Sequence, residues 1–171
     1  MPPLQGARYP EGTDDVRASA GQVNAERVTR LLNDALATEI LCILRYKRHY
    51  YMSAGLHARL AKAQFLQYVG EEQAHADHLA ERIVQLGGTL ELPHAELLSR
   101  SHAEYIEGES LREMLRADLL AERIAIEHYR AMITSLGPND PTTRQVLERI
   151  LVQEEAHAES LAYLARDCTP E

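Results

Sequence analysis

Two copies of one pattern hold the residues of this chain that are best suited to chemistry. Glu39 is followed by a Glu-x-x-His segment at residues 72–75. Glu122 is followed at almost the same interval by a second such segment at residues 154–157. Residues three apart share a helix face, so each segment directs one carboxylate and one imidazole the same way. The pattern therefore predicts a site for two metal ions, with Glu39, Glu72, His75, Glu122, Glu154 and His157 as candidate ligands.

Four helices are expected to carry these residues. The chain has 171 residues and only 9 glycines, and Ala, Leu, Glu and Arg are plentiful, which favours helix. Helices are predicted at about 23–52, 57–86, 110–136 and 141–166, with Gly, Pro or capping residues at their ends. Residues 1–24 are rich in Pro, Gly, Asp and Ser and are predicted to form a flexible arm. Residues 25–171 are then one domain.

The lengths of the connections predict the topology. The first two helices, and likewise the last two, are joined by a few residues, so each pair is expected to form an antiparallel hairpin. The second and third helices are separated by the segment from Gly87 to Glu109. At roughly 3.3 Å per extended residue, that segment can run the length of a helix. The expected fold is an all-α four-helix bundle with a long crossover connection.

All six candidate ligands lie on the apolar faces of these helices, where residues are spaced alternately by three and four. Each carboxylate is also at a similar distance along its helix from a hairpin turn. At a rise of 1.5 Å per residue, all four should lie roughly 20 Å from the turns, in one layer. Glu71, Glu127 and Glu155 are off these faces and are expected to point outward.

Four ionised carboxylates inside a bundle would repel one another and be poorly solvated. Two divalent cations would offset that charge and leave the imidazoles neutral as ligands. An oxygen and nitrogen ligand set without thiolates favours Fe or Mn over structural zinc. A single Glu-x-x-His pair is more often a solvated helix face, and Glu91 and His94 match the pattern around Pro93 in the crossover. The combination of two pairs, apolar faces and equal depth favours the metal site.

These residues resemble the ferritin-like di-iron carboxylate family, and bacterioferritin most closely. The segments Ala-Asp-Leu-Leu-Ala-Glu at 117–122 and Glu-Glu-Ala-His at 154–157 are similar to its third- and fourth-helix motifs. The likeness covers roughly residues 25–166. The resemblance implies that Glu72 and Glu154 bridge two iron ions, that Glu39 and Glu122 are terminal ligands, and that His75 and His157 each bind one metal. It also implies that Tyr46 lies beside the metals and can donate an electron.

Three departures from bacterioferritin carry expectations of their own. Gln73 replaces the methionine that binds haem between subunits, so no haem of that kind is expected. The few residues after His157 are too short for the fifth helix of 24-subunit ferritins, which favours a 12-subunit cage of the Dps type over a 24-mer or a dimer. Arg8 and Arg17 in the arm are balanced by Glu11, Asp14 and Asp15, unlike a Lys-rich tail that binds DNA.

Composition narrows the remaining classes. A net charge of −8 argues against a nucleic-acid binder and suits a protein that attracts cations. No apolar run approaches the roughly 20 residues needed to span a bilayer, and residues 1–21 lack an export signal. Only two cysteines occur, too few for a disulfide framework, so the cytoplasm is the expected compartment. Cys42 is expected to be a small buried thiol, with a redox role as the alternative, and Cys168 to be incidental.

Several other residues have a structural and a functional interpretation. His49 could mark an ion path or an accessory metal site, but a partly buried polar residue is the simpler interpretation. Tyr68 and Tyr129 are expected in the core, where a hydroxyl could bond a ligand carboxylate. Surface positions are expected for His57, His78 and His128.

The sequence thus favours a ferroxidase that oxidises Fe(II) with O2 or H2O2, coupled to iron storage in a homo-oligomeric cage. One alternative is a di-metal peroxidase or catalase without storage, either rubrerythrin-like or manganese-dependent. The absence of Cys-x-x-Cys pairs counts against the rubrerythrin type. The other alternative is a non-enzymatic cage that protects DNA, against which the acidic charge counts.

Overall fold

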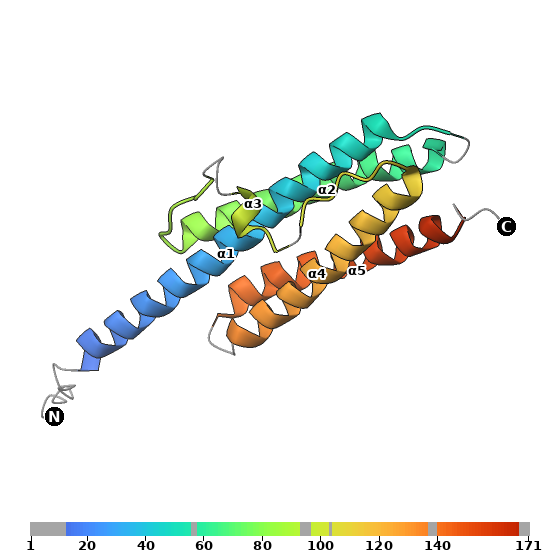
Figure 1. The fold of residues 1–171 in the computed structure, drawn as a ribbon. Coiled ribbons are helices and arrows are strands. Elements are labelled where there is room, and N and C mark those ends of the chain that lie inside the picture. The colour runs from blue at the N-terminus through green and yellow to red at the C-terminus, as the bar shows by residue number, and fades with distance from the viewer. Residues whose placement is uncertain (1–12, 56–57, 93–96, 103, 137–139, 168–171) are drawn as a thin grey trace, which may run out of the picture.

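The computed structural model describes residues 13–55, 58–92, 97–102, 104–136 and 140–167. Within them the chain is helical, and four long helices run side by side (Figure 1). They are α1 (Thr13–Met52), α2 (Ala58–Gln85), α4 (Leu111–Leu136) and α5 (Pro141–Asp167). A short helix, α3 (Leu97–Arg100), interrupts the crossover and was not expected from the sequence. The predicted all-α four-helix bundle with a long crossover is confirmed.

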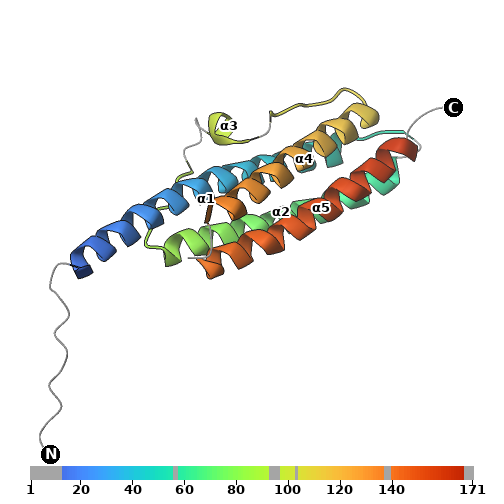
Figure 2. The same ribbon diagram turned by 90° about the horizontal axis from the view of Figure 1, so that it is seen from below.

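The start of α1 differs from the prediction. The helix was expected near Val23 but begins at Thr13, and its first turns extend past the other helices (Figures 1 and 2). The segment before Val23 lacks apolar periodicity, but from Thr13 onward it contains no Pro, and Gly21 is its one glycine. A helix already nucleated by packing extends through such residues at little cost. Residues 1–12 of the expected arm lie outside the described residues.

The other helix ends follow from local hydrogen bonds. Gly87, at φ 75°, donates from its N–H to the Val84 carbonyl, and Gly88 donates to the Ile83 carbonyl. The positive φ is the conformation that favours glycine after a helix C-terminus. At the start of α5, the Asp140 carboxylate accepts the N–H of Thr143 at 3.0 Å. This is the hydrogen bond expected of an N-cap residue.

Two apolar clusters fill the bundle on either side of a polar layer. One cluster lies toward the α4–α5 turn and contains Leu32, Leu79, Ile83 and Leu147. The other lies toward the α1–α2 turn and contains Tyr46, Phe65, Leu115 and Leu161. On α2, α4 and α5 the candidate ligands lie between the two clusters along the helix. The core thus holds the polar layer from both ends.

The crossover runs along the outside of α1 and α4 and is anchored by polar contacts (Figure 2). Asn33 donates to the Thr89 carbonyl and accepts the N–H of Glu91. Arg100 forms an ion pair with Asp34 at 2.9 Å. These contacts attach Thr89, Glu91 and Arg100 of the crossover to two adjacent residues of α1. Among the described helices, none is both long enough and apolar enough to cross a lipid bilayer.

A buried cluster of charged side chains joins α1 to α4 next to the polar layer. Arg45 donates from Nε to Asp118 at 2.8 Å, and both side chains are almost fully buried. His49 contacts the other oxygen of Asp118 through Nδ1 at 2.8 Å, and its Nε2 lies 3.0 Å from the Glu107 carbonyl oxygen. His49 is fully buried, deeper than its sequence suggested. Its polar atoms are used to connect α1, α4 and the crossover.

Replacing Asp118 with Asn should destabilise the fold strongly. The substitution keeps the shape of the side chain but leaves the buried Arg45 guanidinium without its counter-charge. Removing one partner of a buried pair costs about 3–5 kcal/mol, and urea unfolding would measure the loss. The matched control is Glu127→Gln, which breaks the exposed pair with Arg130 and should cost less than about 1 kcal/mol. Equal losses in both variants would contradict the structural role of Asp118.

Candidate metal centre

The bundle brings all six predicted ligands into one buried layer. Their exposed fractions do not exceed 3%. Their oxygen and nitrogen atoms form two overlapping groups, and the atoms within each group all lie within 4.8 Å of one another. The first group is Glu39, Glu72, His75 and Glu154, and the second is Glu72, Glu122, Glu154 and His157.

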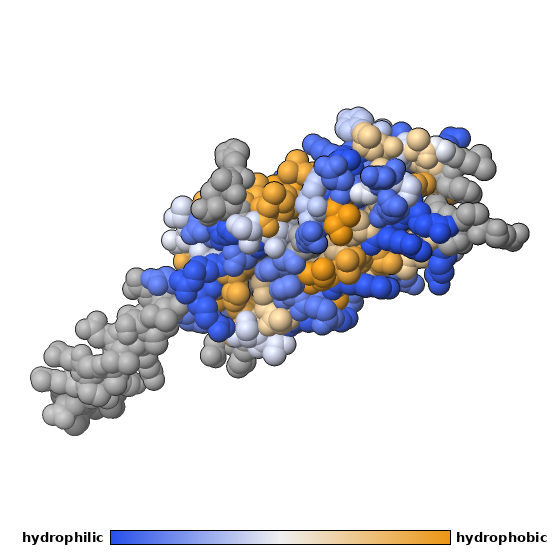
Figure 3. Space-filling view, viewed as in Figure 1, coloured by the Kyte–Doolittle hydropathy of each residue, from blue (hydrophilic) through white to orange (hydrophobic). Residues whose placement is uncertain are grey.

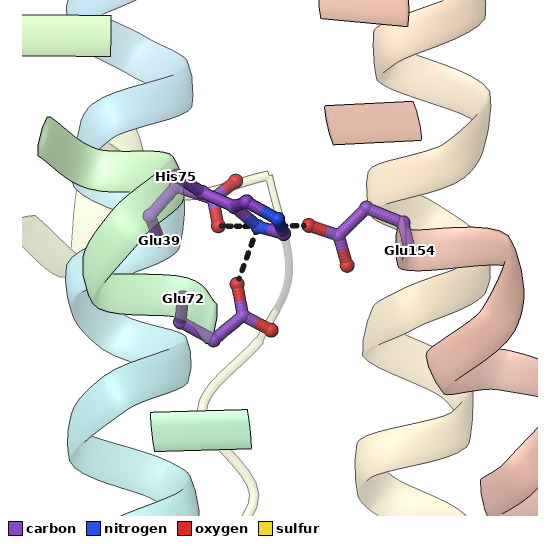
Figure 4. Close-up of side chains that lie close together, drawn as sticks. All are labelled: Glu39, Glu72, His75 and Glu154. Atoms are coloured by element: carbon purple, nitrogen blue, oxygen red, sulfur yellow. Dashed lines mark hydrogen bonds and ion pairs between the residues drawn. The ribbon is translucent and has the colours of Figure 1, made fainter. Parts of the chain in front are cut away.

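The first group surrounds Nδ1 of His75 (Figure 4). This nitrogen lies 3.0 Å from Glu154, 3.2 Å from Glu72 and 3.4 Å from Glu39. Glu154 reaches across from the second hairpin, whereas the other three residues belong to the first hairpin (Figure 4). Both hairpins are therefore needed to complete this group.

The second group surrounds Nδ1 of His157. This nitrogen lies 3.3 Å from Oε1 of Glu72, 3.6 Å from Oε2 of Glu154 and 4.0 Å from Oε2 of Glu122. Here Glu72 is the residue that comes from the opposite hairpin. The two groups therefore repeat one arrangement with the hairpins exchanged.

Glu72 and Glu154 each take part in both groups through different oxygens. Glu72 faces His75 with Oε2 and His157 with Oε1, and Glu154 faces the same two rings with Oε1 and Oε2. Glu39 and Glu122 each belong to one group. This is the geometry that two bridging carboxylates and two terminal carboxylates would have around a pair of cations.

Four buried polar atoms of this layer have no hydrogen-bond partner among the described residues. They are Glu39 Oε2, Glu72 Oε1, Glu122 Oε2 and His157 Nδ1. A buried polar atom without a hydrogen-bond partner costs roughly 1–3 kcal/mol, so native proteins rarely contain several together. All four are carboxylate oxygen or imidazole nitrogen atoms, and metal ligands of these types suit divalent iron or manganese. The residues present thus fit a pair of such cations.

The outer nitrogens of both imidazoles are also held. Nε2 of His75 lies 3.0 Å from Oε1 of Gln153, and Nε2 of His157 lies 2.7 Å from Oε2 of Glu71. The expectation that Glu71 points outward was wrong, because the side chain is only 29% exposed and reaches His157. The missed signal was its position: Glu71 and Gln153 each directly precede a Glu-x-x-His pair. Glu127 and Glu155 are exposed, as predicted.

Two tyrosines connect the hairpins through the terminal carboxylates. Tyr46 on α1 donates to Glu122 on α4, and Tyr129 on α4 donates to Glu39 on α1. Such hydrogen bonds from outside the ligand set fix the orientation of a carboxylate. Tyr46 therefore lies beside the predicted ligands. Tyr129 is buried, and its hydroxyl bonds the carboxylate of a candidate ligand, as the sequence suggested. The Tyr68 ring lies 4.1 Å from the His157 ring and 5.2 Å from the Tyr46 ring, measured between centroids.

Residues 29–169 match the family of ferritin-like domains described under the name Ferritin. The chain belongs to the ferritin-like family. It is 31% identical to a bacterioferritin of Brucella melitensis over 139 residues, which is 79% of this chain and 80% of the relative. It is 33% identical to a nutrient stress-induced DNA-binding protein of a Synechococcus species over 143 residues, 80% of each chain.

A solved structure agrees with this ferritin-like assignment. The dodecameric thioferritin of Bacteroides fragilis, described as a bacterioferritin-related protein, superposes with a TM-score of 0.82 at 24% identity. The match covers 91% of this chain and 94% of that one. The predicted resemblance to the ferritin-like family is therefore confirmed.

In this ferritin-like bundle, protons can occupy the space between the carboxylates. Burial raises the pKa of Glu72 to about 8, and repulsion from Glu39 and Glu122 adds to the effect. Burial acts the same way on Glu39, but the close approach of Glu72 and His75, with the hydrogen bond from Tyr129, outweighs it and holds the pKa of Glu39 below the ordinary value. Of these two neighbouring carboxylates, Glu72 is therefore the one that holds a proton, and Glu39 is ionised. Burial and the neighbouring Glu154 also raise the pKa of Glu122.

The two imidazoles hold protons for the same reason. Burial acts to lower the pKa of His157, but the carboxylates of Glu154 and Glu72 close to its Nδ1 raise it to about 11. The pKa of His75 is raised likewise by Glu154, Glu39 and Glu72 against the effect of burial. The positive charges of the two imidazolium rings therefore partly balance the negative charge of the carboxylates. Because a metal ligand must be deprotonated, any cation that binds here displaces these protons.

The secondary candidates divide into described and undescribed residues. Cys42 is buried, as predicted, and accepts a hydrogen bond from Nη2 of Arg45 at 3.3 Å. Burial raises the pKa of its thiol well above the ordinary value, and its redox role stays a prediction. His128 is half-buried rather than on the surface, because its ring stacks on His102 with centroids 3.8 Å apart. His78 is also half-buried, and His57 and Cys168 lie outside the described residues.

The metal-free protein should lose stability as pH rises from about 6 to about 9. Between an ordinary pKa of 4.5 and about 8, folded Glu72 keeps a proton that the unfolded chain has lost. His157 does the same between 6.5 and about 11. Because the folded state binds more protons throughout this window, its free energy of unfolding falls with rising pH. Urea unfolding of chelator-treated protein would measure the fall, and Glu72→Gln should reduce it. A stability that rises over this range would contradict the proton assignment.

Proposed function

We propose that this protein is a ferroxidase that oxidises Fe(II) at the buried layer, with O2 or H2O2 as the oxidant. The observation that carries the proposal is the division of Glu72 and Glu154 between the two groups. Each carboxylate offers one oxygen to each position, which suits two cations held side by side. Fe(II) is the substrate here, and the chain's contribution is the binding geometry. The two irons per subunit, with manganese as an alternative metal, are part of this proposal.

The overall reaction needs two electrons, which a pair of Fe(II) ions supplies. With H2O2 and two protons, two Fe(II) ions give two Fe(III) ions and two water molecules. With O2 and two protons, they give two Fe(III) ions and one H2O2. Pairing the irons therefore matches the electron count of both oxidants. A lone Fe(II) would supply one electron and leave a radical product.

The chain's own residues would have three tasks. The four carboxylates and the Nδ1 atoms of His75 and His157 would bind the two Fe(II) ions. Gln153 and Glu71 would keep the two imidazole rings oriented. The apolar clusters on both sides restrict water, which strengthens electrostatic interactions in the layer. Tyr46, donating to Glu122, is placed where it can supply an electron if only one iron is present.

We extend the proposal to iron storage in a homo-oligomeric cage of 12 subunits. The similar thioferritin of Bacteroides fragilis is dodecameric. Apolar residues also gather on the surface over α4 and the neighbouring crossover, where Figure 3 shows orange patches between hydrophilic regions. Leu120 is 50% exposed and Ile106 is 38% exposed, and both line the same pocket. Exposed apolar groups of this kind are typical of subunit contacts.

Light scattering should give a mass of twelve times the 19.2 kDa chain. The assembled protein, loaded with Fe(II) and oxidant, should retain far more iron than the two ions that each site can hold. Iron analysis after gel filtration would count the retained ions. A stable dimer would remove the storage part of the proposal and leave the oxidation chemistry standing.

Two alternatives remain open to test, and one expected absence stays a prediction. A peroxidase or catalase would turn over H2O2 without accumulating iron. DNA binding, the property named for the Synechococcus relative, is disfavoured by the net charge of −8. The absence of bacterioferritin-type haem stays a prediction. It is supported by Gln73, an exposed amide that contacts Asp77 and offers no thioether.

Replacing Glu72 with Ala should remove the fast phase of Fe(II) oxidation. The change deletes one oxygen from each position, so neither group is complete, and we expect the rate to fall at least about tenfold. Stopped-flow absorbance of Fe(III) under O2 or H2O2 would measure it. Glu127→Ala, an exposed glutamate on α4, is the control and should oxidise at the wild-type rate. An unchanged rate in Glu72→Ala would rule out this site.

A further inference from the structure

The two halves of the metal centre differ at one pair of matching positions. Glu71 and Gln153 each directly precede a Glu-x-x-His pair, and each contacts the histidine of the opposite hairpin. Glu71 reaches Nε2 of His157 at 2.7 Å, and Gln153 reaches Nε2 of His75 at 3.0 Å. The repeated arrangement thus places a carboxylate behind one imidazole and a neutral amide behind the other.

We propose that Glu71 makes the two cation positions unequal. The position formed by Glu122 and His157 binds its divalent cation more tightly and fills first, and the position formed by Glu39 and His75 fills second. This inference rests on the proposed two-metal site and adds to it an order of loading. Glu71 acts through His157 and is a positioning residue, not a ligand.

The physical reason is the strength of the hydrogen bond behind each ring. When Nδ1 of a histidine binds a cation, the proton is on Nε2, which then donates to its partner. A carboxylate acceptor makes a charge-assisted bond and raises the basicity of the ring more than an amide oxygen does. The His157 ring is therefore the stronger donor to a cation. The negative charge of Glu71 also lies on the side of that position.

The hydrogen bonds that reach the carboxylates from tyrosines do not differ between the two halves in this way. The two bridging carboxylates are shared, and each terminal carboxylate accepts a hydrogen bond from one tyrosine, Tyr46 or Tyr129. Arg45 is positive and lies near Glu122, but Asp118 accepts its hydrogen bond at 2.8 Å and balances its charge. Among the described side chains that hydrogen-bond the candidate ligands from outside the set, Glu71 and Gln153 are thus the matched pair that differs in charge.

Access to solvent favours the same position. A cavity of about 290 Å³ opens on the α2–α5 face and is lined by polar residues that include Gln64, Gln67, Glu71, Gln153 and Ser160. Of the six candidate ligands, His157 is the one in its wall. Gln67 donates to the second oxygen of Glu71 at 2.9 Å, which holds the carboxylate at this opening. A cation that enters by this face therefore meets the His157 position first.

Titration of the intact metal-free protein with Co(II), followed by its visible absorption, tests the proposal. The wild type should bind two Co(II) ions per chain in two steps. Glu71→Gln keeps an acceptor for Nε2 but removes the charge, and it should weaken the first step about tenfold, so that the steps converge. Gln153→Glu should tighten the second step. Glu155→Gln, an exposed glutamate in the same repeat, is the control and should leave both steps unchanged.

Variants in which one cation position is disabled show which Co(II) binding step belongs to which position. In Glu39→Ala, which disables the His75 position, Glu71→Gln should weaken the remaining Co(II) site. In Glu122→Ala, which disables the His157 position, Glu71→Gln should have no effect. The opposite assignment would overturn the proposed order.

Failure of the inference can be told from failure of the proposed function. If the wild type binds two Co(II) ions and oxidises Fe(II), but neither Glu71→Gln nor Gln153→Glu changes either step, the inference is wrong and the ferroxidase proposal stands. If the wild type neither binds two Co(II) ions nor oxidises Fe(II), the proposed function itself is wrong. Circular dichroism of each variant would establish that the helices are intact.

Discussion

Repulsion among four buried carboxylates is the constraint on which the rest of this structure depends. Glu39, Glu72, Glu122 and Glu154 are all within 2% of full burial, so water cannot disperse their charge. In the metal-free protein the imidazoles of His75 and His157 are both protonated, and the carboxyl group of Glu72 holds a further proton. Cations and protons therefore compete for the same space. The layer is stable only when one or the other fills it.

The scaffold is arranged to keep these charges together. Apolar side chains on both sides of the layer contribute burial energy that the layer itself cannot supply. The Arg45–Asp118 pair and the two tyrosine hydroxyls each join α1 to α4, so the hairpins are held across the layer where repulsion acts. A bundle that relaxed outward would lose these bonds and expose the carboxylates. The geometry of the site is thus maintained by contacts outside the ligand set.

The convergence of the six candidate ligands could be predicted from the sequence because their spacing obeys helix geometry. A period of 3.6 residues decides which side chains share a face, and hairpin turns decide their depth. The position of Glu71 before a Glu-x-x-His pair was a signal in the sequence, but its contact with His157 also depends on how α2 packs against α5. The early start of α1 was missed because residues 13–22 carry no apolar pattern. The depth of His49 was missed because its partner, Asp118, is on another helix. Local patterns predicted the elements, and contacts between elements needed the structure.

The repeated pattern also explains why one residue can affect the whole centre. Each hairpin supplies a Glu-x-x-His pair whose carboxylate faces the histidine of the other hairpin as well as its own. The residue before each pair crosses in the same way, so Glu71 and Gln153 modify the opposite half of the site. In a strictly symmetric arrangement the two cation positions would be equivalent, and loading would have no preferred order. In our proposal, the carboxylate-for-amide difference between Glu71 and Gln153 removes that equivalence without altering any candidate ligand. Two similar hairpins can therefore hold the same ligands and still bind their two cations unequally.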